Sequence, residues 1–222
     1  MSHIRPTLTI TKAQAHDYLA LTNIWERSVR ATHDFLTESA ILDIRNDVFD
    51  IYLRAMDVHV AFLVWDVPQS LSENLPENSP SYPLPQKLET ALSNLSNLPN
   101  LSNLPNDLLG NEGAHGSSLE PDLAGGDWQK DSHEVRRTPL GFLGVQESHI
   151  AMLFIDQPYH RLGLGEMLIR YALGLGVNSV NVNEQNPNAF AFYSKMGFTQ
   201  YDRSPLDAQG NPFPILHLRF TG

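Results

Sequence analysis

The chain has 222 residues, a net charge of −10 and no cysteine. The absence of thiols excludes disulfides, cysteine nucleophiles, cysteine-based zinc sites and iron–sulfur clusters. The acidic balance disfavours nonspecific binding to nucleic acid or to an anionic membrane. The sequence shows neither an apolar signal segment at its start nor a run of 18 apolar residues, so we expect a cytoplasmic protein that is not inserted in a membrane.

Two amphipathic helices are predicted in the first quarter of the chain, near residues 13–30 and 38–56. The apolar positions that repeat at helical spacing are Leu21, Ile24, Trp25 and Val29 in the first, and Ile41, Ile44, Val48, Ile51, Tyr52 and Ala55 in the second. A short apolar run, His59–Asp66, has the length of a strand and follows the second helix.

The composition changes abruptly over residues 67–137. This stretch contains 8 of the 15 prolines, and the hexapeptide LSNLPN occurs twice in tandem, at Leu95–Asn100 and Leu101–Asn106. Proline every few residues is incompatible with a helix or an interior strand, so we interpret 67–137 as a disordered or loosely ordered, low-complexity insertion in one domain of residues 1–222. A docking strip for a partner is the alternative. The insertion falls where a hairpin connection would normally lie, and we expect the domain to fold without it.

The second half alternates strands and helices. Strands are predicted at 139–148, 149–156 and 177–184, helices at 163–175 and 186–196, and two final strands around the turn 208–211. Asn186 is a good N-cap, Pro187 suits the first helical position, and Gly197 ends that helix. The element order indicates a mixed α/β (α+β) fold.

Two segments of this half could carry chemistry. After the strand that ends at Asp156, the sequence His160-Arg161-Leu162-Gly163-Leu164-Gly165 opens a helix, where backbone N–H groups could bind a phosphate. It lacks the lysine of a Walker motif and the third glycine of a dinucleotide fingerprint, and it could equally be a tight loop that packs a helix on a sheet. The second segment, Asn186–Phe198, contains Tyr193, which its helical spacing also allows to be a core residue.

Together, the two segments resemble the GNAT superfamily of N-acetyltransferases, and the chain outside the insertion is similar to its small bacterial YjaB-like members. The family's Q/R-x-x-G-x-G/A motif aligns with His160–Gly165, and its Asn, followed by FY-x-K-x-GF, aligns with Asn186 and Phe192–Phe198. The segment WERSVRATHDFL, Trp25–Leu36, also looks like bacterial members. The resemblance implies a central sheet of about six to seven strands flanked by about four helices.

The resemblance also implies acetyl-CoA as co-substrate, with no metal, and direct transfer to a primary amine in a ternary complex. Acetyl-CoA would lie in a V-shaped opening, with its pyrophosphate on the amides of His160–Gly165 and its pantetheine arm along Leu153, Phe154 and Ile155. Asn186 would hydrogen-bond that arm, and Tyr193 would protonate the departing thiolate. The sequence departs from the family at His160, where Gln or Arg is usual. Glu166 in the first helical turn would repel phosphate unless it points to solvent.

The acceptor amine must be neutral to attack. A lysine-type amine has a pKa of ~10.4, so its deprotonation at pH 7 costs about 4.6 kcal/mol, whereas an α-amine costs only about 1 kcal/mol. The base is therefore important for a lysine acceptor. Glu184 is the first candidate for this catalytic role, beside Glu147, His149 and His33, and a water relay is also possible. His33 and Asp34 are candidate substrate-binding residues, and Glu26 could also bind a cationic acceptor.

We expect a small-molecule or peptide amine as the partner, no nucleic acid, no membrane, and a monomer or homodimer. The resemblance implies that the first two helices and the final strand hairpin select the acceptor. The alternative function is a GNAT scaffold that binds acetyl-CoA as a sensor or interaction module without turnover.

Overall fold

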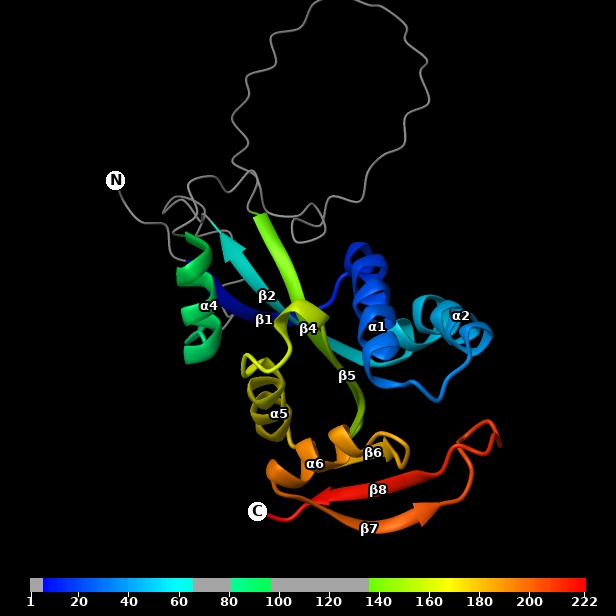
Figure 1. The fold of residues 1–222 in the computed structure, drawn as a ribbon. Coiled ribbons are helices and arrows are strands. Elements are labelled where there is room, and N and C mark those ends of the chain that lie inside the picture. The colour runs from blue at the N-terminus through cyan, green and yellow to red at the C-terminus, as the bar shows by residue number, and fades with distance from the viewer. Residues whose placement is uncertain (1–5, 66–80, 97–135) are drawn as a thin grey trace, which may run out of the picture.

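The computed structural model describes residues 6–65, 81–96 and 136–222, and their strands form one eight-stranded sheet in the order β3-β1-β2-β4-β5-β6-β8-β7 (Figure 1). The strands are β1 (Thr7–Lys12), β2 (Asp57–Trp65), β3 (Ser81–Tyr82), β4 (Arg136–Gln146), β5 (His149–Ile155), β6 (Ser179–Asn183), β7 (Phe198–Ser204) and β8 (Ile215–Phe220). Neighbouring strands are antiparallel except for β5 and β6, which are parallel.

The helices are α1 (Tyr18–Thr32), α2 (Glu38–Asp47), α3 (Leu53–Ala55), α4 (Gln86–Ser96), α5 (Leu164–Gly174) and α6 (Pro187–Lys195), with 3-10 turns η1 (Ala15–Asp17) and η6 (Gln157–Tyr159). The single helix predicted at 38–56 is α2 followed by the π-helical turn η2 (Val48–Tyr52) and α3. No helix in the described ranges is both long and apolar enough to cross a membrane.

The core lies on both faces of the sheet, because successive side chains of a strand point to opposite faces. On β2, Val60 and Phe62 pack in the cluster that holds Ile24 and Trp25 of α1. Ala61 and Leu63 pack in the other cluster, with α4, α5 and α6. Figure 1 shows α1 and α2 on one side of the sheet and α4 and α5 on the other. The mixed α/β fold predicted from the sequence is therefore confirmed.

The first strand, β1, was missed by the sequence analysis. Thr7–Lys12 contributes Leu8 and Ile10 to the core beside α5, and it pairs along its whole length with β2. The period-two alternation of Leu8 and Ile10 among threonines is a typical strand pattern, although the segment is only six residues long.

Part of the predicted insertion belongs to the domain, which corrects the interpretation of 67–137 as disordered throughout. Ser81–Tyr82 forms β3 and pairs with β1, and α4 covers one face of the sheet, with Leu88 fully buried. Leucines at helical spacing give α4 an apolar face that offsets the prolines before it. At the other end, Arg136 and Arg137 are residues of β4. Residues 66–80 and 97–135 lie outside the described residues, and they include the second LSNLPN repeat and all of the first except Leu95 and Ser96, which end α4.

The strands on either side of the insertion are direct neighbours. β2 and β4 pair antiparallel from Asp57↔Val145 to Trp65↔Arg136, as expected for a long connection inserted where a hairpin turn would lie. The connection between β2 and β4 therefore begins and ends at neighbouring positions, at the same end of this strand pair.

Candidate active site

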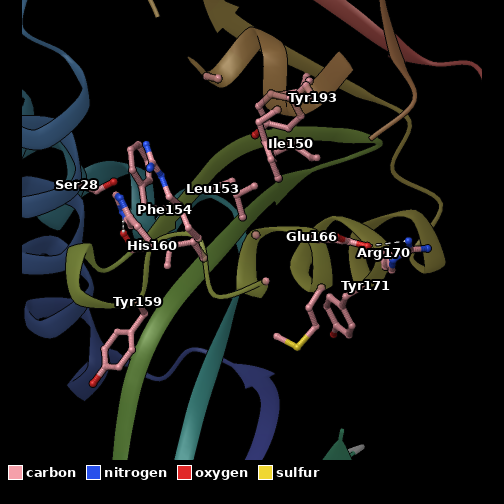
Figure 2. A pocket seen from close by; sticks show the side chains of 18 of the residues that line it. Ser28, Ile150, Leu153, Phe154, Tyr159, His160, Glu166, Arg170, Tyr171 and Tyr193 are labelled. Carbon is pink, nitrogen blue, oxygen red and sulfur yellow. Dashed lines mark hydrogen bonds and ion pairs between the residues drawn. The ribbon is translucent and has the colours of Figure 1, made fainter. Parts of the chain in front are cut away.

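A V-shaped opening separates the two parallel strands in the middle of the sheet. β5 and β6 pair only at His149↔Ser179 and Ile150↔Val180, and beyond those pairs they diverge. A cavity of about 1520 Å³ occupies the opening, lined by residues of β5, β6, α1, α5, α6 and the loop before α5 (Figure 2). It is larger than the pockets of typical small ligands, so it has room for a long ligand and a second reactant.

Strand β5 presents unpaired backbone groups to this opening. The N–H of Asp156 donates to the carbonyl of Leu140 at 2.9 Å, so the backbone groups of even-numbered residues here face β4. Alternation then turns the N–H and C=O groups of Leu153 and Ile155 toward the opening, and those of Phe154 toward β4. The Nε2 atom of His160 forms a hydrogen bond of 2.7 Å with the Ile155 carbonyl, so this carbonyl already has a partner. Leu153 is thus the position at which an extended ligand could pair with β5.

The loop before α5 forms a concave surface of backbone amides. Gly163 is the N-cap in a left-handed conformation, with φ of 94°, and the first amide bonded within the helix is that of Met167, to Gly163. The amides of the preceding first turn therefore have no partner in the helix, which favours an anion. A Cβ at Gly165 would lie 3.2 Å from the Phe192 ring, so a larger residue there would require this ring to shift. Of the two sequence interpretations, the geometry favours the phosphate-binding loop.

The cavity is basic although the chain is acidic. Its described lining includes the cations Lys87, Arg161, Arg170 and Lys195, against the single acid Glu166. Glu166 points along α5 to Arg170, at 2.8 Å, rather than at the loop (Figure 2). The hydrogen bond from Arg170 lowers the pKa of the Glu166 carboxyl. Because Arg170 neutralises this acid, the cavity retains a net attraction for anions.

Tyr193 reaches the cavity from α6 and is almost fully buried, with 6% of its surface exposed. Its ring packs against Phe192 and Phe198, with centroids 5.2 and 5.6 Å away. Burial raises the pKa of the Tyr193 hydroxyl well above its ordinary value. No hydrogen bond joins this hydroxyl to another residue within the described ranges. Tyr193 is therefore a protonated phenol available to a ligand.

Asn186 caps α6 and also lines the cavity. Its side-chain oxygen accepts from the Ala189 amide at 3.0 Å, as the sequence predicted for an N-cap. The side-chain oxygen is thereby occupied, and the amide NH₂ remains as a donor toward the cavity.

His33 also lines the cavity, directly after α1. Its Nδ1 is 2.8 Å from the Thr32 hydroxyl, which is also 2.7 Å from the Ser28 carbonyl. A carbonyl can only accept, so the single Thr32 hydroxyl proton points to Ser28 and the hydroxyl oxygen accepts from His33 Nδ1–H. The neutral ring therefore carries its lone pair on Nε2. Burial lowers the pKa of His33, although Asp34 opposes this effect.

The structure does not bring the other sequence candidates to the cavity. Glu184 forms an exposed ion pair with Arg203 at 2.6 Å, which lowers the pKa of its carboxyl and makes it a weaker base. Asp34 is exposed, and neither residue belongs to the cavity lining. Three further candidates also lie outside the lining: Glu26, held by Arg30 and Arg45; Glu147, in the β4–β5 turn; and His149, bonded to Ser179.

Among the lining residues that sequence reasoning missed are one group before His33 and another before α4. Ser28 and Thr32 fix the orientation of His33, but only their i to i+4 spacing before a histidine hints at this role. The segment Tyr82–Lys87 was assigned to the insertion because of its prolines, and no local pattern places it at the cavity.

Comparison with known proteins agrees with this geometry. Residues 132–213 match the model of the acetyltransferase (GNAT) domain. A segment of 88 residues is 40% identical to the peptidyl-lysine N-acetyltransferase YjaB of Escherichia coli, covering 39% of this chain and 60% of that protein. The protein of the same name from Salmonella typhimurium is 44% identical over 81 residues, 36% of this chain and 56% of the relative. The matches thus span less than two thirds of the length of these curated relatives.

Solved structures agree at the level of the fold. The solution structure of apo YjaB from Escherichia coli matches with a TM-score of 0.59 and 24% identity, covering 97% of this chain and 98% of that one. A GCN5-related N-acetyltransferase from Rhodopseudomonas palustris matches with a TM-score of 0.52 and 13% identity, covering 100% and 99%.

The chain has the GNAT fold, and its residues 132–213, which contain the β5–β6 opening and the loop before α5, match the model of the GNAT acetyltransferase domain. Within that class, the matched part of the sequence is similar to YjaB of Escherichia coli and Salmonella typhimurium.

Proposed function

We propose that the protein is an N-acetyltransferase that transfers the acetyl group of acetyl-CoA to a primary amine by direct attack. The observation that carries this proposal is the β5–β6 opening, which joins a basic loop of free amides to a buried, protonated Tyr193. The GNAT domain match over 132–213 supports the same donor.

Acetyl-CoA would bind along the whole opening. Its pyrophosphate would accept hydrogen bonds from the amides of the 161–165 loop at the start of α5. Its pantetheine arm would pair with the Leu153 backbone, and the Asn186 amide would donate to the same arm. In this assignment, Leu153 and Ile155 form the edge of β5 that faces the ligand. The backbone groups of Phe154 face β4, and its ring packs against Phe142.

The acetyl carbonyl would lie where β5 and β6 diverge. Attack by the amine nitrogen forms a tetrahedral intermediate, and a β5 backbone N–H stabilises its oxyanion, a contribution worth about 3–4 kcal/mol for a well-placed donor. Collapse of the intermediate breaks the C–S bond. The Tyr193 hydroxyl supplies the proton that converts the departing thiolate to the thiol of CoA.

His33 is the general base in this scheme. Its Nε2 lone pair is free because Thr32 holds Nδ1–H, and its lowered pKa keeps the ring neutral at pH 7. It lines the cavity, which Glu184, Glu147 and His149 do not. A water molecule can bridge His33 and the amine where the two do not touch directly.

The acceptor that we propose is the side-chain amine of a lysine in a peptide or protein. The YjaB relatives are named peptidyl-lysine N-acetyltransferases, and such an amine requires a base. The acceptor would enter beside His33, where Phe35 contacts both His33 and Phe213, with ring centroids 5.3 and 5.8 Å apart. The α1–α2 loop and the β7–β8 hairpin meet at this point.

The test begins with calorimetric titration of the full chain with acetyl-CoA, CoA and ATP. We expect acetyl-CoA and CoA to bind in the micromolar range and ATP not to bind. Release of CoA thiol is then measured with two peptides, one with a lysine and a blocked N-terminus, the other with a free α-amine and no lysine. Faster release with the lysine peptide supports the proposed acceptor. Binding without release for any amine would instead establish an acetyl-CoA-binding scaffold, and the absence of binding would refute the proposal.

A further inference from the structure

Residues 82–87, between β3 and the first turn of α4, lie within the predicted insertion and yet form part of the cavity wall. The segment is fixed at both ends. β3 pairs with β1 at the edge of the sheet, and Leu88 of α4 is fully buried in the cluster that contains Leu164 and Leu168 of α5. The Tyr82 ring also meets the Tyr171 ring edge-on, with centroids 6.1 Å apart.

This segment touches the amide loop directly. A Cβ added to Gly163 would lie only 2.9 Å from the Cβ of Pro85, so the proline ring packs against the loop at a distance that leaves no room for a side chain. The segment lines the cavity with Tyr82, Pro83, Pro85, Gln86 and Lys87. The same lining includes Arg161 of the loop before α5 and Arg170 of α5.

The charges of this segment suit an anionic ligand. Residues 67–137 contain ten acidic and four basic residues, yet the charged residue that they contribute to the described lining is a lysine, Lys87. Glu89, two positions further along α4, is exposed and does not line the cavity. The phosphate groups of CoA are the anions that the proposed function brings to this end.

We propose that the inserted segment completes the CoA site, with Lys87 pairing with a phosphate of the nucleotide end. The inference rests on the proposed function, since it assumes that CoA is the ligand. It assigns to the β3–α4 segment a binding role that the family motifs in residues 160–165 and 186–198 do not cover.

Titration of the full chain and of Lys87→Gln with CoA and 3′-dephospho-CoA tests this inference. We expect Lys87→Gln to weaken CoA binding roughly three- to tenfold at low salt, with a smaller effect at high salt. Lys87→Arg should retain most of the affinity. Arg219→Gln, which removes one exposed cation on β8 outside the cavity, is the matched control and should bind CoA like the unchanged chain.

The two ligands also identify the phosphate. If Lys87 pairs with the 3′-phosphate, Lys87→Gln loses affinity for CoA alone, and if it pairs with the pyrophosphate, both ligands weaken equally. Unchanged affinity of Lys87→Gln for both ligands would overturn this inference and leave the proposed function intact. Failure of the unchanged chain to bind CoA would overturn both.

Discussion

At the scale of single residues, the proposed chemistry divides between two side chains that line the same cavity, Tyr193 of α6 and His33 after α1. Burial between Phe192 and Phe198 keeps the Tyr193 hydroxyl protonated, so it has a proton to donate. The Thr32 hydroxyl holds His33 in the tautomer that can only accept at Nε2. The two pKa values are displaced in opposite directions, so at neutral pH Tyr193 carries a proton and His33 can accept one.

Replacing Tyr193 with phenylalanine removes the donor and little else, because the hydroxyl has no hydrogen bond to a described residue. We expect kcat to fall roughly 10²- to 10⁴-fold, while the acetyl-CoA dissociation constant from titration changes little. Thiol release measures the first quantity. Tyr201→Phe, at an exposed site on β7, is the control. Unchanged turnover of Tyr193→Phe would remove this residue from the mechanism.

The base assignment predicts a particular pH profile with a lysine acceptor. Both His33 and the amine must lose a proton, and the pKa of His33 is lowered by burial. The logarithm of kcat/KM should therefore rise with a slope of about two below the His33 pKa and about one above it, up to the pKa of the amine. In His33→Gln the slope should be about one throughout, at a rate that is roughly 10²-fold lower.

His149→Gln provides the comparison for this profile, because burial also lowers the pKa of His149 but its ring bonds Ser179 outside the cavity. Its profile should match that of the unchanged chain. A profile of slope one at low pH in the unchanged chain would point to water, rather than His33, as the proton acceptor.

At the scale of elements, local sequence signals located the site better than they located its surroundings. The caps of α6 and the glycines before α5 are encoded within a few residues, and Asn186 and Gly163 lie where the sequence indicated. The wall at Tyr82–Lys87 depends instead on the burial of Leu88 against a helix more than 70 residues away, which no local pattern reports. The ion pair of Glu184 could not be foreseen for the same reason, since its partner Arg203 is distant in sequence.

The glycine of the loop offers a test of this close packing. Gly163→Ala would force a Cβ into a left-handed conformation and against Pro85, so it should reduce the free energy of unfolding by about 1–2 kcal/mol and weaken CoA binding. Gly174→Ala, at the end of the same helix, meets no atom within 4 Å and should be neutral or slightly stabilising. Urea unfolding of both variants provides the measurement, and equal stabilities would contradict this account of the loop.

At the scale of the whole molecule, the structure changes what removal of the insertion should do. Sequence composition predicted that the domain would fold without residues 67–137, but that segment supplies β3, α4 and the start of β4. Loss of a buried leucine such as Leu88 alone costs about 2–5 kcal/mol.

We therefore expect a chain in which a short turn replaces 67–137 to be destabilised by at least that amount in urea unfolding. A chain that lacks only 100–130 retains every described element, and its free energy of unfolding should stay within about 1 kcal/mol of that of the full chain. Equal stability of the longer deletion would show that α4 contributes little to the core.

The pairing of β2 with β4 also has a kinetic consequence. About 70 residues separate Trp65 from Arg136, which pair at the open end of the two strands. Closing a loop of that length costs about 2.5 kcal/mol more in chain entropy than closing a four-residue hairpin. The two halves of the sheet should therefore join late during folding, after β1–β2 and β7–β8 have formed. Until they join, the opening between β5 and β6 lacks the lining that α1 and residues 82–87 contribute, so the ability to bind a ligand should be among the last properties that the refolding chain acquires.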